Sequence, residues 1–574
     1  MKKYSLTLCV FFLFLLHTIA QSTVINNATL IDVETGKSLV GRNILIEGEK
    51  IIKISSRKIK TKKQTTIIDA TGKFIIPGLI DTHMHFFQTG SLYTRPDAID
   101  LTAIKPYEKE IEFANSIITD HFKRYLRLGI TTVMDVGGPF SNFTIRDSIA
   151  AEHIAPNIYV TGPLFSPYQP EALSKIEDIP IEEIKTIAAA TAHFNKMMAY
   201  KPDFIKIWGI ITNEMTLERV APIVAHIAKL THQNNLKLTV HATDLETAKM
   251  VVKAGADILV HSVDDVKVDD EFIALLQKNK VTYIPTLIVA KNYGRAFLGK
   301  PSNHPIDLAF ANPISYATMT DVKQYTDEQA PEIVKVMRKN ERSIFKNYAT
   351  KDAIMLNNLK MLSDAGINIA TGTDAGNIGT MHASSYLQET ATMANVLSPI
   401  EILKASTINA AKGFGLEEKL GSIATGKLAD LVILDKNPLE NIENITTITS
   451  VIKSGKVLDL NTISKESPEY IVQRQLNAYN ARDIDTFMNT YADDIKLYNF
   501  PEEISVASKA DMRKNFEAMF ERAPNLYCEL KNRIVIGNKV IDQEYVRAND
   551  NYFDAVAIYE IENGKIAKVT FLRK

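Results

Sequence analysis

The segment FIIPGLIDTHMHF, residues 74–86, is an apolar run that ends in two histidines separated by one residue. Successive side chains point to opposite faces of a β-strand, so His83 and His85 point the same way from one strand end. Neutral imidazole is a common metal ligand. The segment therefore predicts a buried strand that carries two metal-ligand candidates. Taken alone, it agrees equally well with two histidines that only cap a buried strand.

Four later side chains that can bind a metal also follow short apolar runs. They are Lys206 in DFIKIW, His241 in LKLTVHA, His261 in ADILVHS and Asp374 in INIATGTDAG. In a parallel (β/α) barrel, the catalytic groups lie at the C-terminal ends of the strands. We therefore expect these four side chains to meet the two histidines at one end of such a barrel.

Candidate strands alternate with helical patterns along the middle of the chain, which indicates a parallel sheet. The eight candidates are residues 78–85, 130–135, 157–162, 203–208, 237–241, 257–261, 281–287 and 367–374. The metal-ligand candidates fall on the first, fourth, fifth, sixth and eighth of them.

In the order and the residues of these motifs, the chain resembles the metal-dependent amidohydrolase superfamily, in particular its imidazolonepropionase-like and prolidase-type branch. The likeness runs from about residue 23 to about residue 459 and is carried by PGLIDTHMH, TVHA, LVHS, TGTDAG and GSIATGKLADLVILDKNPL. It implies an α/β fold with a (β/α)8 TIM barrel over residues 78–414. A small composite β-sandwich, made from residues 21–77 and 415–460, would flank the barrel.

The resemblance also implies a centre of two divalent metal ions, which we expect to be zinc. The implied ligands are His83, His85, Lys206, His241, His261 and Asp374. A free ammonium has no lone pair for a metal, so Lys206 would be carboxylated and bridge the two ions.

Two alternatives for the lysine and the metal count stay open at this point. Lys206 could instead form an ion pair with a carboxylate. The site could also hold one metal, as in deaminase-like relatives, with Asp244 or Glu246 after the fifth strand as the base.

The implied reaction is hydrolysis by a metal-activated hydroxide, because paired metals lower the pKa of a shared water. The expected target is an amide or peptide-like C–N bond in a dipeptide, an N-acyl amino acid or a cyclic amide. Asp374 would take the proton of the attacking water and pass it to the leaving nitrogen, and it could also cap a helix. The same site could hydrolyse a lactone, an ester or a phosphotriester. A catalytically silent ligand-binding protein is the alternative outside enzymes.

A long connection follows the seventh strand, and long βα connections at the catalytic face shape substrate sites. Tyr283, Arg295 and His382 are therefore candidates for contact with a small-molecule substrate. Each agrees equally well with a packing or solvated role.

The sequence changes character after a polar linker at residues 461–467. Residues 468–574 show a helix followed by strand patterns, and they resemble the cone-shaped α+β domain of nuclear transport factor 2, SnoaL-type cyclases and ketosteroid isomerase. The positions of the three catalytic residues of the isomerase hold Gln475, Asn499 and Ala557. We therefore expect an accessory domain that binds a ligand or pairs subunits in a homo-oligomer, because a fold alone does not carry a function.

The composition is that of a multidomain globular protein. The chain has 574 residues, of which 45% are hydrophobic and 23% charged, and its net charge is -1. The length exceeds what one hydrophobic core supports. The balanced charge provides no electrostatic footprint for nucleic acid.

Residues 1–20 have the pattern of a secretory signal peptide. Lys2 and Lys3 precede a short apolar run, and Thr18-Ile19-Ala20 resembles a cleavage site. The run is too short to span a membrane, so we expect no stable membrane insertion after the signal is removed. The mature protein would be exported, either periplasmic or secreted. Cleavage would leave one cysteine, Cys528, and hence no intrachain disulfide.

Overall fold

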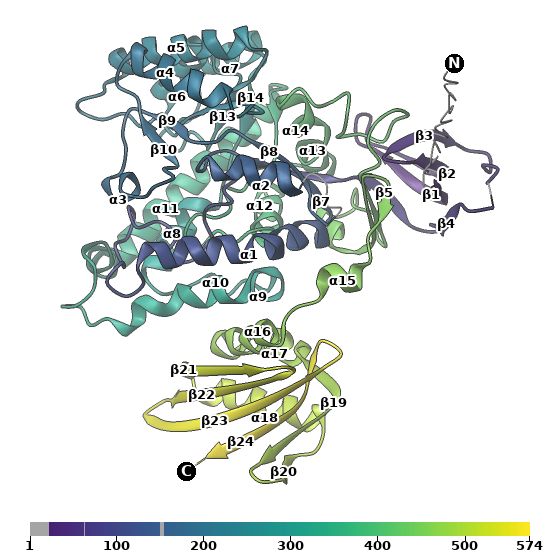
Figure 1. The fold of residues 1–574 in the computed structure, drawn as a ribbon, viewed down its shortest axis with the longest axis vertical. Coiled ribbons are helices and arrows are strands. Elements are labelled where there is room, and N and C mark those ends of the chain that lie inside the picture. Colours follow the sequence, from purple (N-terminus) through teal and green to yellow (C-terminus); the bar gives the residue numbers. More distant parts are fainter. Residues whose placement is uncertain (1–21, 62, 150–153, 574) are drawn as a thin grey trace, which may run out of the picture.

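The computed structural model describes residues 22–61, 63–149 and 154–573 (Figure 1). The predicted signal peptide lies outside these residues. No helix in the described part of the chain combines the length and the apolar character needed to cross a membrane.

Eight parallel strands occupy the segments that the sequence predicts. A three-stranded sheet contains β6 (Leu79–Met84), β7 (Ile130–Asp135) and β8 (Asn157–Val160). A second sheet contains β11 (Ile205–Ile207), β12 (Leu238–His241), β13 (Ile258–Val260), β14 (Thr282–Ile284) and β15 (Asn368–Ile369). Backbone hydrogen bonds join the two sheets on both sides, from Asp203 N to Val160 O and from Thr82 N to Thr371 O. The predicted barrel is confirmed.

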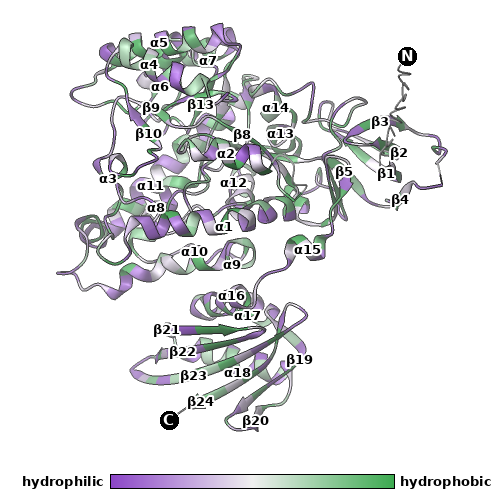
Figure 2. Ribbon diagram, in the orientation of Figure 1, coloured by the Kyte–Doolittle hydropathy of each residue, from purple (hydrophilic) through white to green (hydrophobic). Residues whose placement is uncertain are grey.

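Helices cover the outside of these strands because one face of each is apolar. In α1 (Tyr107–Arg127), the buried side chains include Ala114, Ile117, His121 and Tyr125, which recur at helical spacing. Figure 2 shows hydrophilic and hydrophobic residues alternating along this helix. The other outer helices are α2 (Ser141–Ile149), α4 (Ile187–Met198), α5 (Leu217–Gln233), α6 (Leu245–Lys253), α7 (Asp270–Asn279), α11 (Glu332–Asp364), α12 (Ser384–Met393), α13 (Pro399–Ala405) and α14 (Ile408–Gly413).

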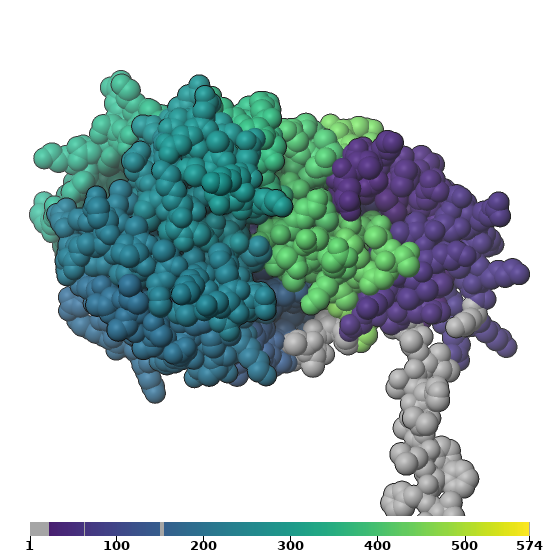
Figure 3. Space-filling view, turned by 90° about the horizontal axis from the view of Figure 1, so that it is seen from above, coloured from purple at the N-terminus to yellow at the C-terminus, as the bar shows by residue number. Residues whose placement is uncertain are grey.

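The two predicted strand-rich segments form one eight-stranded sheet beside the barrel. Its strands are β1 (Ser22–Asp32), β2 (Lys37–Glu47), β3 (Lys50–Ser55), β4 (Thr66–Asp69), β5 (Phe74–Pro77), β16 (Leu431–Leu434), β17 (Ile448–Lys453) and β18 (Lys456–Val457). The two halves meet where β5 pairs with β16, with Ile76 opposite Val432. Figure 3 shows the green C-terminal half directly against the purple N-terminal strands. The composite character of this domain is confirmed.

Two excursions from the barrel approach its C-terminal face. The first contains β9 (Leu164–Ser166), α3 (Glu171–Ser174) and β10 (Ile181–Glu183). The second follows β14 and contains α8 (Val289–Phe297), α9 (Pro305–Phe310), α10 (Pro313–Ala317) and the 3-10 helix η1 (Thr318–Gln324). We call residues 289–324 the helical insertion.

The C-terminal region forms an α+β domain with its own hydrophobic cluster, which includes Phe487, Tyr491 and Ile566. Its helices are α16 (Pro468–Ala481), α17 (Ile484–Asn489) and α18 (Lys509–Arg522). Its sheet has the order β20-β19-β24-β23-β22-β21, with β19 (Tyr491–Asn499), β20 (Glu503–Val506), β21 (Tyr527–Ile536), β22 (Lys539–Ala548), β23 (Asn551–Glu562) and β24 (Lys565–Arg573). This arrangement agrees with the predicted cone-shaped domain.

The segment predicted as a polar linker contains a short helix, α15 (Leu460–Ser464). Asp459 caps this helix by accepting a hydrogen bond from Asn461 N. Ile463 is buried in a cluster with Leu126 and Val451. The connection between the barrel and the C-terminal domain is therefore packed against the barrel.

Candidate active site

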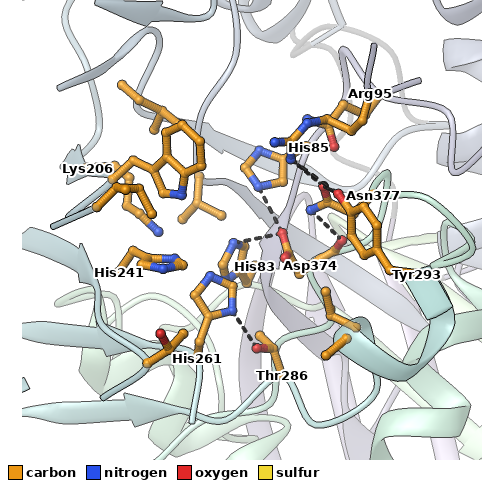
Figure 4. Close-up of a pocket in the computed structure, with 18 of the residues that line it drawn as sticks. His83, His85, Arg95, Lys206, His241, His261, Thr286, Tyr293, Asp374 and Asn377 are labelled. Carbon is orange, nitrogen blue, oxygen red and sulfur yellow. Dashed lines mark hydrogen bonds and ion pairs between the residues drawn. The ribbon is translucent and has the colours of Figure 1, made fainter. Parts of the chain in front are cut away.

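The ends of the barrel strands bring the six predicted metal-ligand residues together (Figure 4). His83 lies on β6 with His85 just after it, Lys206 lies on β11, His241 ends β12, His261 follows β13 and Asp374 follows β15. The ring centroids of His83 and His261 are 4.9 Å apart, and those of His241 and His261 are 4.5 Å apart. Asp374 Oδ1 lies 3.1 Å from His83 Nε2 and 3.0 Å from His85 Nε2. All six side chains line one cavity.

The donor set fits a divalent cation. Ligand atoms of His83, His261 and Asp374 all lie within 4.8 Å of one another. His83 Nδ1 and His241 Nδ1 are buried and have no hydrogen-bond partner among the described residues, a situation that native interiors rarely leave unexplained. Imidazole and carboxylate together are ligands that zinc accepts.

The protonation states also suit metal binding, which requires neutral imidazoles. Burial lowers the pKa of His83 to about 4 and the pKa of His241 to about 3. Burial opposes ionisation of Asp374, but the adjacent His83 and His85 outweigh it and hold the pKa of this carboxyl well below its usual range. Near neutral pH His83 and His241 are therefore neutral and Asp374 is a carboxylate.

Hydrogen bonds behind the histidines orient two of the rings. His85 Nδ1 donates to Gly137 O at 2.8 Å, and this bond holds the ring with Nε2 directed at Asp374. His261 Nδ1 is 2.7 Å from Thr286 Oγ1. Such partners fix the tautomer and the direction of a metal-binding imidazole.

Two of the metal-ligand residues have a strained backbone conformation. His261 and Asp374 adopt φ angles of 74° and 58°, in the left-handed region that residues other than glycine rarely occupy. Gly372, in the TGTDAG motif, has no room for a side chain, because a Cβ there would lie 2.8 Å from the Cβ of His83. Strain of this kind persists where the surroundings over-determine the geometry, as they do at functional sites.

Lys206 is 2% exposed, and its side chain points toward the histidines (Figure 4). No carboxylate of the described residues forms an ion pair with its amine, which argues against the ion-pair alternative. Burial lowers the pKa of Lys206 to about 7. The two base candidates of the one-metal alternative lie outside the cavity: Asp244 caps α6 through Thr247 N, and Glu246 is exposed on that helix.

The cavity has a volume of about 280 Å³ and two distinct walls. One wall is apolar and includes Leu164, Leu173, Ile181 and Trp208, so the first excursion contributes most of it. A second wall is polar and contains Arg95, Tyr293 and Asn377, and it adjoins the apolar wall where the Arg95 guanidinium carbon lies 5.9 Å from the Trp208 ring centroid. A substrate at the metal-ligand residues would therefore contact both a hydrophobic surface and hydrogen-bonding groups.

The polar wall is a connected group that the sequence reasoning missed. Arg95 Nη1 and the Tyr293 hydroxyl both donate to Asn377 Oδ1, at 2.8 Å and 2.7 Å. Asp97 neutralises Arg95 through two hydrogen bonds of 2.7 Å and 2.5 Å. Asn377 lies three residues after Asp374, so proximity to the motif was a usable signal for this residue. Arg95 and Tyr293 carried no local signal, because each comes from a long connection.

The structure places the three predicted substrate residues away from this cavity. The Tyr283 hydroxyl is buried and accepts a hydrogen bond from Val263 N. Arg295 lines a separate surface pocket. His382 is buried behind the site, where its Nε2 donates to Gln88 O and its Nδ1 is 3.1 Å from the Tyr125 hydroxyl.

Replacing Thr286 with valine should weaken metal binding about 10–100-fold, because the substitution keeps the shape and removes the partner of His261 Nδ1. Competition between the protein and a chelator for zinc measures this change. Thr191→Val is the matched control, since Thr191 Oγ1 lies 2.8 Å from His226 Nε2 on the outer helices. Equal zinc affinity in Thr286→Val and the wild type would show that Thr286 does not orient the ring.

Comparison with known proteins gives two family matches. The amidohydrolase family model matches residues 74–458, and the SnoaL-like domain model matches residues 472–569. The imidazolonepropionase of Fusobacterium nucleatum is 21% identical over 459 residues, which cover 72% of this chain and 91% of the relative. The imidazolonepropionase of Shouchella clausii is 33% identical over 106 residues, which cover 18% of this chain and 24% of the relative. The match thus spans about a quarter of the length of that second relative.

Solved structures share the fold over about three quarters of the chain. A Xaa-Pro dipeptidase with bound methionine aligns with a TM-score of 0.58 and 23% identity, over 76% of this chain and 100% of the other. Molinate hydrolase aligns with a TM-score of 0.57 and 20% identity, over 78% and 96%. At this identity the likeness shows the fold. Because the family model covers the barrel and the flanking sheet from β5 onward, the chain belongs to the amidohydrolase family and carries a SnoaL-like domain at its C-terminal end.

Proposed function

We propose that the protein is a metal-dependent hydrolase of an amide or peptide-like C–N bond. The observation that carries this proposal is the convergence of four imidazoles, a carboxylate and a buried lysine in one cavity at the strand ends. The names of the relatives, which include imidazolonepropionases and a Xaa-Pro dipeptidase, support the same class of reaction.

The residues that would hold the metals are His83, His85, Lys206, His241, His261 and Asp374. Two bound divalent ions, which we expect to be zinc, would supply Lewis-acid polarisation of the carbonyl and acidify a water molecule. Asp374 is the carboxylate at the centre of this group, so it can accept a proton from the attacking water and return it to the leaving nitrogen. Gly137 O and Thr286 keep the rings of His85 and His261 in place during these transfers.

We infer that Lys206 reacts with carbon dioxide to form a carbamate. The neutral amine forms the N–C bond and releases one proton, so the product carries a negative charge and two ligand oxygens. Burial supports this step, because an ammonium at this position faces four imidazoles and has no carboxylate in hydrogen-bond contact among the described residues.

Apart from the six metal-ligand residues, the charged side chains that line the cavity are paired with a residue of opposite charge. Arg95 is balanced by Asp97, and Asp264 is balanced by Lys351 at 2.7 Å. Together with the adjoining apolar wall, this arrangement supports a substrate that places an apolar group next to the scissile bond. Dipeptides, N-acyl amino acids and cyclic amides with such groups are the candidates.

A substrate panel on zinc-loaded protein tests the proposed function. We expect turnover of at least one apolar dipeptide, N-acyl amino acid or cyclic amide, and loss of that turnover on chelation. Lactones, esters and phosphotriesters on the same panel test the alternative reactions. Stoichiometric metal without turnover of any compound would instead favour a silent binding protein.

Lys206→Ala should reduce the bound metal from about two equivalents to about one, because the substitution removes the bridging oxygens. A short carboxylic acid should partly restore the second equivalent, since its carboxylate supplies two similar oxygens. Elemental analysis after gel filtration measures both changes. Lys351→Ala is the control. It removes the amine that pairs with Asp264 of the cavity lining, and the variant should keep two equivalents of metal. One equivalent in the wild type would refute the bridge.

We also propose that the protein is exported. The basis is Lys2 and Lys3 before a short apolar run that ends at Thr18-Ile19-Ala20. N-terminal sequencing of protein from its native host should find a chain that begins at Gln21. A native chain that begins at Met1 would contradict export by this route.

A further inference from the structure

The polar wall of the cavity is supported by a separate hydrophobic core. Arg95 comes from the loop after β6, Tyr293 from α8 and Asn377 from the loop after β15. Neighbours of all three pack together in one cluster, which we call the accessory core. Its members include Leu92, Ile99, Phe297, Met319, Val322 and Ile378. The position of this wall therefore depends on how the helical insertion packs.

The insertion holds the Arg95 loop directly. Leu92 N donates to Thr318 Oγ1 at 2.9 Å, and the Tyr93 hydroxyl donates to Asp321 Oδ2 at 2.8 Å. Both partners lie on η1. Arg95 lies three residues after Leu92 and two residues after Tyr93. The location of η1 therefore sets where the Arg95 guanidinium enters the cavity.

The C-terminal domain holds the insertion from the opposite side. Figure 1 shows α16 beside α9 and α10. Arg474 donates to Leu308 O at 2.6 Å and to Ala311 O at 3.1 Å, and Asn477 Nδ2 donates to Pro313 O at 2.8 Å. The two bonds from Arg474 satisfy carbonyls at the C-terminal end of α9, where the last carbonyls of a helix have no helical partner.

Two more contacts complete this interface. The Tyr527 hydroxyl on β21 lies 3.1 Å from Thr320 Oγ1 on η1. Glu466 accepts hydrogen bonds from Arg474 and, at 2.9 Å, from Arg124 of α1. Arg124 in turn donates to Phe310 O and Ala311 O. A buried network of this kind tolerates the loss of one partner poorly, so it holds the three elements in one arrangement.

We propose that the C-terminal domain is a positioning element of the hydrolytic site. Docked through Arg474 and Tyr527, it holds the helical insertion and thereby keeps Arg95 against Asn377 in the cavity wall. Arg474 acts through these contacts and touches no substrate. The kinetic consequence rests on the proposed function, whereas the placement of Arg95 does not.

The chain carries a built-in reporter of this placement. Trp208 is its single tryptophan, lies in the cavity wall and has the Arg95 guanidinium carbon 5.9 Å from its ring centroid. A guanidinium over an aromatic face shields that face and interacts with it. Displacement of Arg95 should therefore change the emission of Trp208 and its access to a quencher, with no need for turnover.

The test compares full-length Arg474→Met with wild type. We expect KM to rise about fivefold or more with kcat within about twofold, because ground-state and transition-state binding weaken equally. Acrylamide quenching of Trp208 should increase, and the zinc content should stay unchanged. Arg474→Lys keeps the positive charge and one donor nitrogen. It should therefore reverse part of the rise in KM and part of the increase in quenching.

Arg513→Met is the matched control, because Arg513 is 41% exposed and pairs with Asp485 and Glu517 inside the C-terminal domain. The KM, the acrylamide quenching of Trp208 and the zinc content of Arg513→Met should equal those of the wild type. If Arg474→Met does not fold, Tyr527→Phe decides, since it removes one hydroxyl and should still increase quenching. Wild-type quenching in the folded variants would overturn the proposal. Absence of turnover in the wild-type enzyme would overturn the proposed function alone, because the quenching comparison still stands.

Discussion

The convergence of six metal-ligand candidates at one end of the barrel, four of them buried and His241 and His261 half-buried, is the constraint on which the rest of the structure depends. Groups such as His83, Lys206 and Asp374 are costly to remove from water without partners. The barrel accepts them because its parallel strands are rigid and converge, so each side chain is held at a defined distance from the others. Their mutual contacts compensate for part of the lost hydration, and a bound cation, which the donor set fits, would compensate for more.

Several neighbouring features follow from this constraint. Asp81 is fully buried on β6 and accepts hydrogen bonds from His83 N and Thr373, which joins the first strand to the loop of Asp374. Burial raises the pKa of Asp81 to about 7. Gly372 permits the close approach of these two segments. Conserving volume and hydrogen bonds around the centre therefore matters as much as the ligand set itself.

The substrate half of the cavity is built differently. Its walls come from excursions and long connections, which need support of their own to keep a fixed geometry. Leu164, Leu173 and Ile181 of the first excursion form a small hydrophobic cluster with Tyr107 of α1. The helical insertion uses the accessory core and the interface with the C-terminal domain. The C-terminal domain thus stabilises the position of the polar wall through contacts that the barrel strands do not provide.

The sequence by itself determined the eight strands, the six residues at their ends and the α+β character of the tail, because these depend on local periodicity and on short motifs. Only the tertiary structure decided that β5 pairs with β16 across more than half of the chain, and that Arg95, Tyr293 and Asn377 share one wall. It also decided that Tyr283 and His382 lie in the packing behind the site. Periodicity tells which face of an element a side chain occupies. Contacts between distant segments depend on how whole elements pack, and one sequence does not contain that information in a local pattern.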